Sequence, residues 1–344
     1  MPMAEMAGTP HRRPTVYDVA TDAGVSAMSV SRVLNGNGNV SSQMRRRVMR
    51  SVAKLGYRRN ENARSLRPGQ RSGLVGVIIT NIENPYYAQV LLGIEDALDA
   101  SDRRIVVGLS HGDPDRETRL IADFAGRQVE GLVLVPCGAD AAETSRALGD
   151  LPLVLASRAH PGLDADTVVI DDREGSQRGV AALLEEGYRR IAFLGNDEQV
   201  STSQRRFEGY QQALGAAGIA VETGLVRRTC RDQQSSAEAI RGLLATETVD
   251  AVFCANNQVT TGVLPELVAW QRRHPNRALI PVLGVDGFRM SSLVEHPLML
   301  VEHDARALGR SAAELLTNRL GPKVAESAPR VTLTLPTVLR QEHS

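Results

Sequence analysis

The sequence predicts an α/β protein in which a small N-terminal three-helix domain precedes a larger body of two α/β subdomains. Three observations lead to this expectation. Apolar residues recur at helical spacing between residues 15 and 55. From Gly73 onward, short β-branched runs alternate with helical stretches, a pattern typical of parallel sheets. Basic side chains are concentrated near the N-terminus, which separates the first segment from the rest of the chain.

The balanced charge of the whole chain conceals an uneven distribution. The 344 residues carry 40 Lys and Arg and 40 Asp and Glu. Residues 1–72 hold thirteen of the basic and four of the acidic residues, so this segment has a net charge of +9 and the remainder −9. A basic head joined to an acidic body indicates that the head binds a polyanion. A merely soluble basic tail is the alternative, and the spaced apolar residues of the head argue against it.

Composition narrows the class of protein further. No apolar run approaches the length of a membrane span, and the segment MPMAEMAGTPHRRP lacks the apolar stretch of a signal peptide. Cys137, Cys230 and Cys254 are scattered and have no metal-ligand spacing, which favours a reducing compartment. We therefore expect a cytoplasmic protein with no membrane association, no metal and no cofactor.

Sequence motifs of catalysis are missing. The chain contains no GxSxG, Walker A or HExxH motif, and its seven histidines are scattered. The stretch GNGNVS is rich in glycine but follows a predicted helix, so we interpret it as a loop and not as a dinucleotide cradle. We expect no enzymatic activity, although α/β bodies also occur in many enzymes.

Two short helices are predicted on either side of Gly24. Thr15 can cap the first helix, and Asp18 in its first turn favours the positive end of the helix dipole. Ser26 can cap a second helix that runs to about Leu34. Such a pair forms a helix-turn-helix unit, whose second helix enters the major groove of DNA. A third helix over 42–55 completes a DNA-binding domain at residues 1–60.

Side chains of the second helix are the candidates for base reading. Arg32 can pair bidentately with guanine, whereas Ala27 and Met28 offer apolar contact to a thymine methyl, with Ser29 beside them. Phosphate contacts position such a domain without selecting a sequence. A helical hairpin that binds nothing is the alternative, and the charge of +9 argues against it. Side chains suited to phosphate are Tyr17, Ser26, Ser31, Asn35, Ser41 and Arg45.

The segment from Thr15 to Gly69 closely resembles the DNA-binding head of the LacI/GalR family of bacterial transcription repressors. The shared pattern is DVAxxAGVSxxxVSRVLN, then VS, LGY and ARSL, over about 55 residues. Arg59 stands where the family commonly has Pro. Ala27 and Met28 are particular to this chain, which implies an operator that differs from those of its relatives.

Residues 61–72 are predicted to form a hinge helix and linker. A helix of two turns is marginal in water and needs external support. The resemblance implies that support: paired hinge helices of a dimer enter the minor groove, where Leu66 acts as a wedge with Ala63 and Arg64 beside it. An apolar wedge unstacks a base step and bends the duplex. A plain flexible linker is the alternative reading of the same segment.

The body, residues 73–344, is predicted to hold nine strands in two sheets with a ligand cleft between them. Ligands of such folds bind at the carboxyl ends of the strands. We expect an N-subdomain of about 73–170 plus 304–322 and a C-subdomain of about 171–303 plus 323–340. The predicted strands are LVGVII, RIVVGL, EGLVLV, LPLVLA, DTVVI, RIAFLG, DAVFCA, IPVLGV and LMLVEH.

This body resembles, more loosely, a sensor domain of the periplasmic-binding-protein type. The matching pieces include GVIITNIENPYYAQVLLGIE, GYRRIAFLG and VLGVDGF. Arg, Asn and Asp can bind a ring of hydroxyls, and a tyrosine can cover the apolar face of a sugar or purine. Purely structural roles are the alternatives: Tyr86 and Tyr87 could belong to the core, Asp286 could cap a turn, and Arg206 could lie on the surface. The resemblance implies an effector site formed by Tyr86, Tyr87, Val90, Ser157, Ile170, Arg206, Arg231, Asn256, Asp286 and His303.

Some positions in the body depart from the family pattern. Ser157 stands where many members have Asp, Asn257 is often Asp, and Glu130 replaces a common Asp. Arg231 falls where a selector side chain, often aromatic, can lie. A lost carboxylate and an added cation together favour an anionic or phosphorylated effector, which we state as a hypothesis.

We therefore expect a sequence-specific transcription regulator, a repressor, controlled by a small molecule such as a sugar, sugar derivative or purine. It is expected to bind a pseudo-palindromic double-stranded operator as a homodimer, with half-sites about one helical turn apart. Dimer contacts are expected from residues 88–100 and 117–126. The alternative is a small-molecule sensor whose basic head binds nucleic acid nonspecifically or binds a protein partner.

Overall fold

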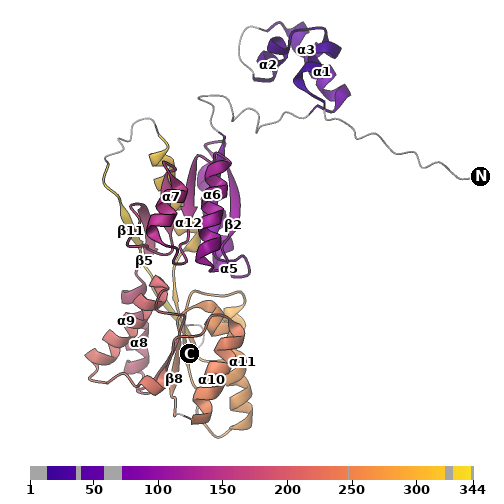
Figure 1. Ribbon diagram of the computed structural model, residues 1–344. Helices are drawn as coiled ribbons and strands as arrows, with labels where there is room; N and C mark the ends of the chain where they lie inside the picture. Colours follow the sequence, from indigo (N-terminus) through magenta and orange to yellow (C-terminus); the bar gives the residue numbers. More distant parts are fainter. Residues whose placement is uncertain (1–13, 36–39, 58–71, 247, 322–327, 342–344) are drawn as a thin grey trace, which may run out of the picture. The chain divides into compact units, whose positions relative to one another are not determined.

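The computed structural model describes residues 14–35, 40–57, 72–246, 248–321 and 328–341. The chain divides into two compact units, residues 1–72 and 73–344, which are called the head and the body below (Figure 1). The predicted hinge residues Ala63, Arg64 and Leu66 lie outside the described residues.

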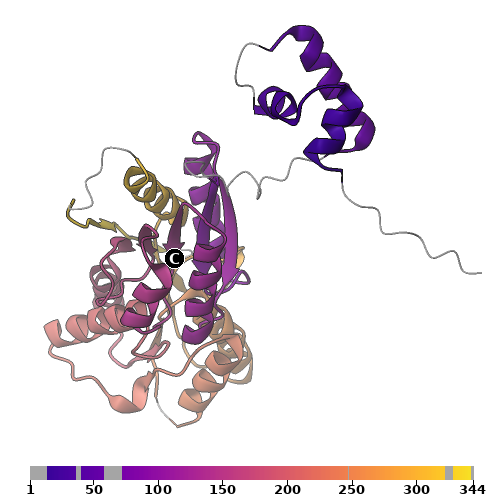
Figure 2. The ribbon, with the colours of Figure 1, turned by 45° about the horizontal axis from the view of Figure 1, so that its top comes forward.

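The described part of the head contains the three predicted helices, α1 (Val16–Ala23), α2 (Ala27–Asn35) and α3 (Ser42–Leu55) (Figure 2). Thr15 caps α1 because its hydroxyl accepts from the Asp18 N–H while the Asp18 carboxylate accepts from the Thr15 N–H at 2.7 Å. Gly24 ends α1 in the left-handed region, with φ at 60°. The helices enclose a small apolar core of Val19, Ala20, Ala23, Val30, Val33 and Val48.

The first sheet of the body is entirely parallel, with the strand order β11-β5-β4-β3-β1-β2. Helices α5 and α12 pack on one core cluster of this sheet, and α6 and α7 pack on the other. The strands are β1 (Leu74–Ile79), β2 (Arg104–Leu109), β3 (Gly131–Leu134), β4 (Leu153–Ala156), β5 (Asp166–Ile170) and β11 (Thr332–Leu335), and the helices are α5 (Pro85–Asp99), α6 (Pro114–Gly126), α7 (Ala141–Leu148) and α12 (Ala305–Arg319).

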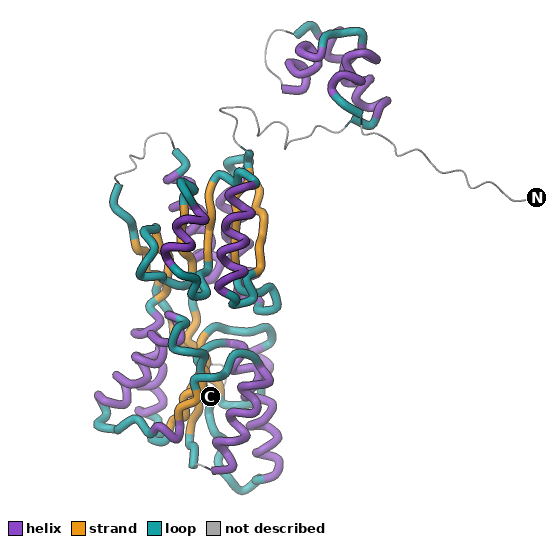
Figure 3. Tube along the Cα trace, viewed as in Figure 1, coloured by secondary structure: helices purple, strands orange, loops and turns teal. Residues whose placement is uncertain are grey.

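The second sheet has the order β12-β10-β9-β8-β6-β7, and only β12 runs antiparallel to its neighbour among these described strands. Figure 3 shows the two groups of strands with helices on both sides. The strands are β6 (Ile191–Leu194), β7 (Val226–Arg227), β8 (Ala251–Cys254), β9 (Val282–Val285), β10 (Leu298–Glu302) and β12 (Val338–Gln341), and the helices are α8 (Asp172–Glu185), α9 (Ser201–Ala216), α10 (Gln233–Thr246) and α11 (Asn257–Arg273), with short 3-10 turns at Thr223–Leu225 and Ser291–Leu293.

Three crossovers join the two subdomains, at 170–172, 302–305 and 335–338. All nine predicted runs form strands, which confirms the α/β class. The assignment of 323–340 to the C-subdomain is wrong for β11, because Thr332–Leu335 pairs with β5 of the first sheet. The short strands β7, β11 and β12 were not predicted. They lie at sheet edges, and their partly exposed side chains do not form the apolar runs of central strands.

Helices α5 and α12 approach each other closely because glycines lie at their contact. A Cβ atom on Gly93 would overlap the carbonyl oxygen of Arg306, and one on Gly309 would overlap the carbonyl oxygen of Val90. This contact packs the middle of α5 against the first turns of α12. Within the described residues, no helix is both long enough and apolar enough to cross a membrane.

Candidate functional sites

A cavity of about 480 Å³ lies between the two sheets of the body. Its wall is formed where strands end, at Thr80 after β1, Ser157 after β4, Asn196 after β6 and Asp286 after β9. This is the edge at which ligands of parallel sheets bind. Eight of the ten residues predicted for the effector site line the cavity: Tyr86, Tyr87, Ser157, Ile170, Arg206, Arg231, Asn256 and Asp286.

The other two predicted residues, Val90 and His303, do not line this cavity. Val90 is fully buried in the first core cluster, which also contains Tyr87 and the α12 residues Leu308 and Ala312. His303 lines a second cavity of about 460 Å³, whose wall also includes Tyr86 and Asp286. The His303 ring therefore lies behind the wall of the first cavity, with Nδ1 at 3.3 Å from Asp286 Oδ1.

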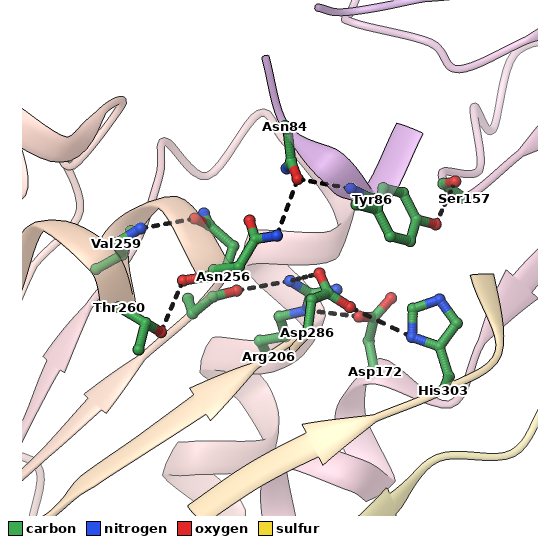
Figure 4. A network of polar contacts seen from close by, with 12 residues as sticks. Asn84, Tyr86, Ser157, Asp172, Arg206, Asn256, Val259, Thr260, Asp286 and His303 are labelled. Atoms are coloured by element: carbon green, nitrogen blue, oxygen red, sulfur yellow. Dashed lines mark hydrogen bonds and ion pairs between the residues drawn. The ribbon is translucent and has the colours of Figure 1, made fainter. Parts of the chain in front are cut away.

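A buried cluster of charges forms the floor of the first cavity (Figure 4). The Arg206 guanidinium donates from Nε to Asp172 Oδ1 at 2.6 Å and from Nη1 to the Ala255 carbonyl at 2.6 Å. Asp286 Oδ2 lies 3.7 Å from Arg206 Nη1. Asp172 begins α8 at the end of the first crossover, and His303 lies on the second, so the cluster joins the cavity to two crossovers.

The environment of this cluster shifts the pKa values of its two carboxyl groups in opposite directions. Burial raises the pKa of Asp172, and the nearby Arg206 only partly offsets this effect. Burial also opposes ionisation of Asp286, but Arg206 and His303 outweigh it and the pKa of Asp286 is lowered. Asp286 therefore faces the cavity as a carboxylate that can accept hydrogen bonds.

Ser157 and Asp286 adopt a left-handed backbone conformation at the cavity, both with φ at 65°. Residues other than glycine rarely adopt this region, and such positions cluster at binding sites. The Ser157 hydroxyl lies 2.6 Å from the Tyr86 hydroxyl and shares a hydrogen bond with it. Burial and the nearby Asp286 raise the pKa of Tyr86, so this hydroxyl keeps its proton.

The side chains that cap helices α5 and α11 also line the cavity. Asn84 caps α5 by accepting from Tyr86 N at 3.0 Å, and Asn256 caps α11 by accepting from Val259 N at 3.0 Å. Asn257 Nδ2 donates to Asn84 Oδ1 at 2.8 Å. This hydrogen bond links the N-subdomain to the C-subdomain beside the cavity.

Sequence reasoning missed several lining residues, among them Asn84, His111, Cys137 and Arg158. An available signal was the Asn-Pro pair at the start of α5, since Asn before Pro favours a capped helix start. Another was Arg158, which lies two residues after the end of β4. Burial and the nearby Glu117 raise the pKa of Cys137 to about 12, so its thiol stays protonated.

The head exposes most of the side chains predicted to contact DNA. Tyr17 and Met28 are 72% and 66% exposed, and Arg32 lies on the same helix as Met28. Ser26, Arg32, Ser41 and Arg45 are exposed, and Ala27, Ser29 and Ser31 are half-buried. Asn35 is the last residue of α2, and its side chain is outside the described part of the chain.

Some polar groups of the head also have structural partners. Ser26 Oγ accepts from Ser29 N at 3.2 Å, and Ser41 Oγ accepts from Met44 N at 3.3 Å, so both serines cap helices. Arg47 Nη2 donates to the carbonyl of Ala23 at 2.6 Å and therefore holds the end of α1. The head is thus a helix-turn-helix unit whose basic residues divide between structural contacts and an exposed surface.

Two family models match the chain in these same units. The model described as "Bacterial regulatory proteins, lacI family" matches residues 15–60. The model described as "Periplasmic binding proteins and sugar binding domain of LacI family" matches residues 72–340.

Curated relatives and solved structures agree with this division. The HTH-type transcriptional regulator CelR of Thermobifida fusca is 31% identical over 97% of this chain and 98% of the relative. Catabolite control protein A of Priestia megaterium is 30% identical over 91% of this chain and 95% of the relative. A structure of a CelR-cellobiose complex has a TM-score of 0.70 at 30% identity and covers 96% of this chain and 99% of that one. The Lac repressor dimer bound to operator and the anti-inducer ONPF shares the fold, with a TM-score of 0.81 at 23% identity over 96% of this chain and 99% of that one.

These matches confirm the predicted helix-turn-helix head and sensor body. The matching families consist of transcription regulators and not of enzymes. The chain belongs to the LacI family of bacterial regulatory proteins, which are DNA-binding transcriptional regulators under small-molecule control.

Proposed function

We propose that this regulator is a cytoplasmic repressor that binds a pseudo-palindromic operator as a homodimer, and that the cavity of about 480 Å³ holds its effector. The observation that carries this proposal is the origin of the cavity wall, which both subdomains supply at the carboxyl edges of their sheets. A ligand in this place contacts both subdomains at once. The expected effector is a sugar, a sugar derivative or a purine-like molecule.

The polar groups of the cavity suit a polyhydroxylated ligand. Asp286 supplies an acceptor, and Arg206 and Asn256 supply groups that can pair with hydroxyls. Tyr86 and Tyr87, at the start of α5, line the same cavity, with ring centroids 5.1 Å apart and edge to face. Such rings can cover the apolar face of a sugar or purine.

The charged cluster supports a route from the effector to the subdomain arrangement. Arg206 and Asp286 line the cavity, and their partners Asp172 and His303 belong to two crossovers. An effector that favours one arrangement of the crossovers shifts the population of that arrangement. By linkage, the effector and operator DNA then change each other's affinity by the same factor.

For the head, we propose that Ala27, Met28, Ser29 and Arg32 read bases. Exposure of Met28 and Arg32 on one helix supports this role. The matching hinge segment is proposed to enter the minor groove through Leu66, flanked by Ala63 and Arg64. Phosphate contacts are proposed for Tyr17, Ser26, Ser31, Asn35, Ser41 and Arg45.

The homodimer is proposed to use the outer surface of the N-subdomain. Leu92 on α5 is 43% exposed and Val107 on the edge strand β2 is 38% exposed, which supports a contact surface on this side. From α6, Ile121 and Phe124 belong to the core of the subdomain, so other side chains of 117–126 would have to form the contact.

The test begins with in vitro selection of random duplex DNA on the purified full-length protein. Enrichment of a palindrome with a fixed centre supports a dimeric reader with a central hinge contact. Effector candidates are then titrated against the selected operator, and the change in operator affinity is measured. Steeply salt-dependent binding with no enriched sequence would instead favour a head that binds nucleic acid nonspecifically.

A further inference from the structure

The wall of the effector cavity has more arginines than carboxylates. Three guanidinium groups and two carboxylates belong to the wall. Asp286 lies 3.7 Å from Arg206 and 3.3 Å from His303. Asp197 lies 4.0 Å from Arg231. Arg158 is the remaining cation, and within the described residues no carboxylate lies within ion-pair distance of it.

The backbone holds Arg158 firmly at this place. Strand β4 ends at Ala156, and Ser157 turns the chain with φ at 65°. Arg158 N then donates to the Ala156 carbonyl at 2.7 Å, which closes a tight turn. A turn of this kind on a buried strand end fixes the direction in which the next side chain leaves the sheet.

The Arg158 guanidinium has hydrogen-bonding capacity to spare. Nη1 donates to the Pro136 carbonyl at 3.2 Å, and Nη2 donates to the Tyr87 hydroxyl at a long 3.5 Å. A guanidinium has five N–H donors in a planar fork that matches a carboxylate or phosphate. The donors left over belong to a residue that lines the cavity.

The buried carboxyl group of Glu117 interacts electrostatically with Arg158 but lies beyond ion-pair distance of it. Glu117 is 1% exposed and accepts from Cys137 N at 2.8 Å, behind the wall of the cavity. Burial raises the pKa of Glu117, and hydrogen bonds from Cys137 and the positive charge of Arg158 only partly offset this effect. The starts of α5 and α6 also reach the wall, at Tyr86 and Pro114, and helix starts favour negative charge.

We propose that the effector carries an anionic group, a carboxylate or a phosphate, and that Arg158 binds this group. This inference rests on the proposed function of the cavity. The rest of the ligand is polyhydroxylated, because the C-subdomain wall is rich in uncharged amides and hydroxyls. These are Asn196, Gln199, Thr202, Ser203, Asn256 and Gln258.

The test compares matched ligands by calorimetric titration of the full-length protein. The pairs are glucose with glucuronate, galactose with galacturonate, and glucose with glucose 6-phosphate, so that carboxylate and phosphate are separated. The variants are Arg158→Gln, which removes the charge, and Arg158→Lys, which keeps the charge without the fork. The control is Arg205→Gln, because Arg205 is an exposed arginine of α9 that does not line the cavity. Thermal melting with inorganic phosphate, against chloride of equal ionic strength, probes the anion subsite alone.

The expected result is that one anionic member binds at least about tenfold more tightly than its neutral partner, as charge-assisted pairing with arginine allows. Arg158→Gln abolishes this advantage, Arg158→Lys keeps part of it, and Arg205→Gln leaves it intact. Equal or tighter binding of the neutral member, or an advantage that survives Arg158→Gln, overturns the proposal. If no sugar binds, the proposal fails unless phosphate raises the melting temperature in the wild type and not in Arg158→Gln.

A separate readout distinguishes this inference from the proposed function. Operator affinity is measured with each ligand that binds. A neutral sugar that alters operator affinity sinks the anionic inference and leaves the effector cavity in place. An anionic ligand that binds through Arg158 without changing operator affinity supports the anionic inference. It contradicts the proposal that the cavity holds the effector.

Discussion

Asn257 and Asn84 form a hydrogen bond between the two subdomains of the body, with Asn257 Nδ2 at 2.8 Å from Asn84 Oδ1. Asn84 Oδ1 also accepts from Tyr86 N at 3.0 Å as the cap of α5. The helix cap therefore determines which atom of the Asn84 amide faces α11. Because that atom is an acceptor, residue 257 must be a donor, and an ionised Asp in its place cannot make this contact.

Asn257→Asp is expected to lower the free energy of unfolding of the body by about 1–3 kcal/mol, because it leaves a carboxylate against a carbonyl oxygen. Urea unfolding of the full-length protein measures this change. A double-mutant cycle with Asn84→Ala and Asn257→Ala isolates the pair and should give a coupling of about 0.5–1.5 kcal/mol. Strictly additive effects in the cycle would show that the two side chains do not stabilise each other.

Arg206→Met is expected to destabilise the body by about 3–5 kcal/mol, because it leaves the buried Asp172 without its ion-pair partner. The Asp172 side chain is 1% exposed, so water cannot replace the lost guanidinium. Adding Asp172→Asn in the same chain should recover part of the loss, since the uncompensated charge is then removed. Chemical denaturation of the wild type, Arg206→Met and the double variant tests this, and a double variant less stable than Arg206→Met alone contradicts it.

The central strands and the helices of the head were predictable because local signals agree with the fold. Buried parallel strands such as LVGVII are continuous apolar runs, and Thr15, Gly24 and Gly56 stop and start helices by local chemistry. The edge strands were not predictable in this way. Thr332–Leu335 alternates polar and apolar residues and finds its place only by pairing with β5 across the sheet.

Several residues that line the cavity could be predicted from the sequence, but the contacts that their side chains make could not. Strand ends and the family resemblance indicated Tyr86, Arg206 and Asp286. That Val90 turns into the core depends on where α12 packs, which is a contact between residues far apart in sequence. In the part of the chain that the structure describes, no carboxylate lies within ion-pair distance of Arg158. This too depends on which carboxylates the fold brings near it, and no local pattern contains that information.

Gly93→Ala should destabilise the body by about 1–3 kcal/mol or more, because the added methyl meets the backbone of Arg306 on α12. Gly242→Ala is the matched control, since the same methyl on α10 meets no atom within 4 Å. The control should be neutral or stabilising by up to about 1 kcal/mol, as alanine favours helix over glycine. Thermal melting of both variants checks the contrast, and equal shifts would mean that the two helices are not in tight contact.

Asp166 is expected to contribute stability that depends on pH. Burial works to raise the pKa of Asp166, but hydrogen bonds from Arg319 at 2.7 Å and from Val331 N at 2.8 Å outweigh it, and the pKa is lowered. Stability from such a group is fully present above the unfolded pKa, about 3.9, and is lost as the pH falls through the folded pKa. Asp166→Asn should therefore be less stable than the wild type at pH 7 by about 1–3 kcal/mol. The gap should narrow below about pH 4. Urea unfolding at several pH values measures the gap, and a gap that does not change with pH contradicts the role of the charge.

Replacing two arginines of the head by alanine is expected to affect different properties, operator affinity for Arg32 and thermal stability for Arg47. Within the described residues Arg32 is exposed and makes no hydrogen bond or ion pair, whereas Arg47 donates to the carbonyls of Ala23 and Gly24 at 2.6 and 3.1 Å. Arg32→Ala should cost about 1–3 kcal/mol of operator binding and relax preference at one base pair. Arg47→Ala should instead lower the melting temperature of the head, because the carbonyls at the end of α1 lose their donor.

Operator titration and thermal melting of both variants separate the two effects, since Arg32→Ala should leave the melting temperature unchanged. Loss of stability in Arg32→Ala, or unchanged operator affinity, would mean that α2 does not present Arg32 to the bases.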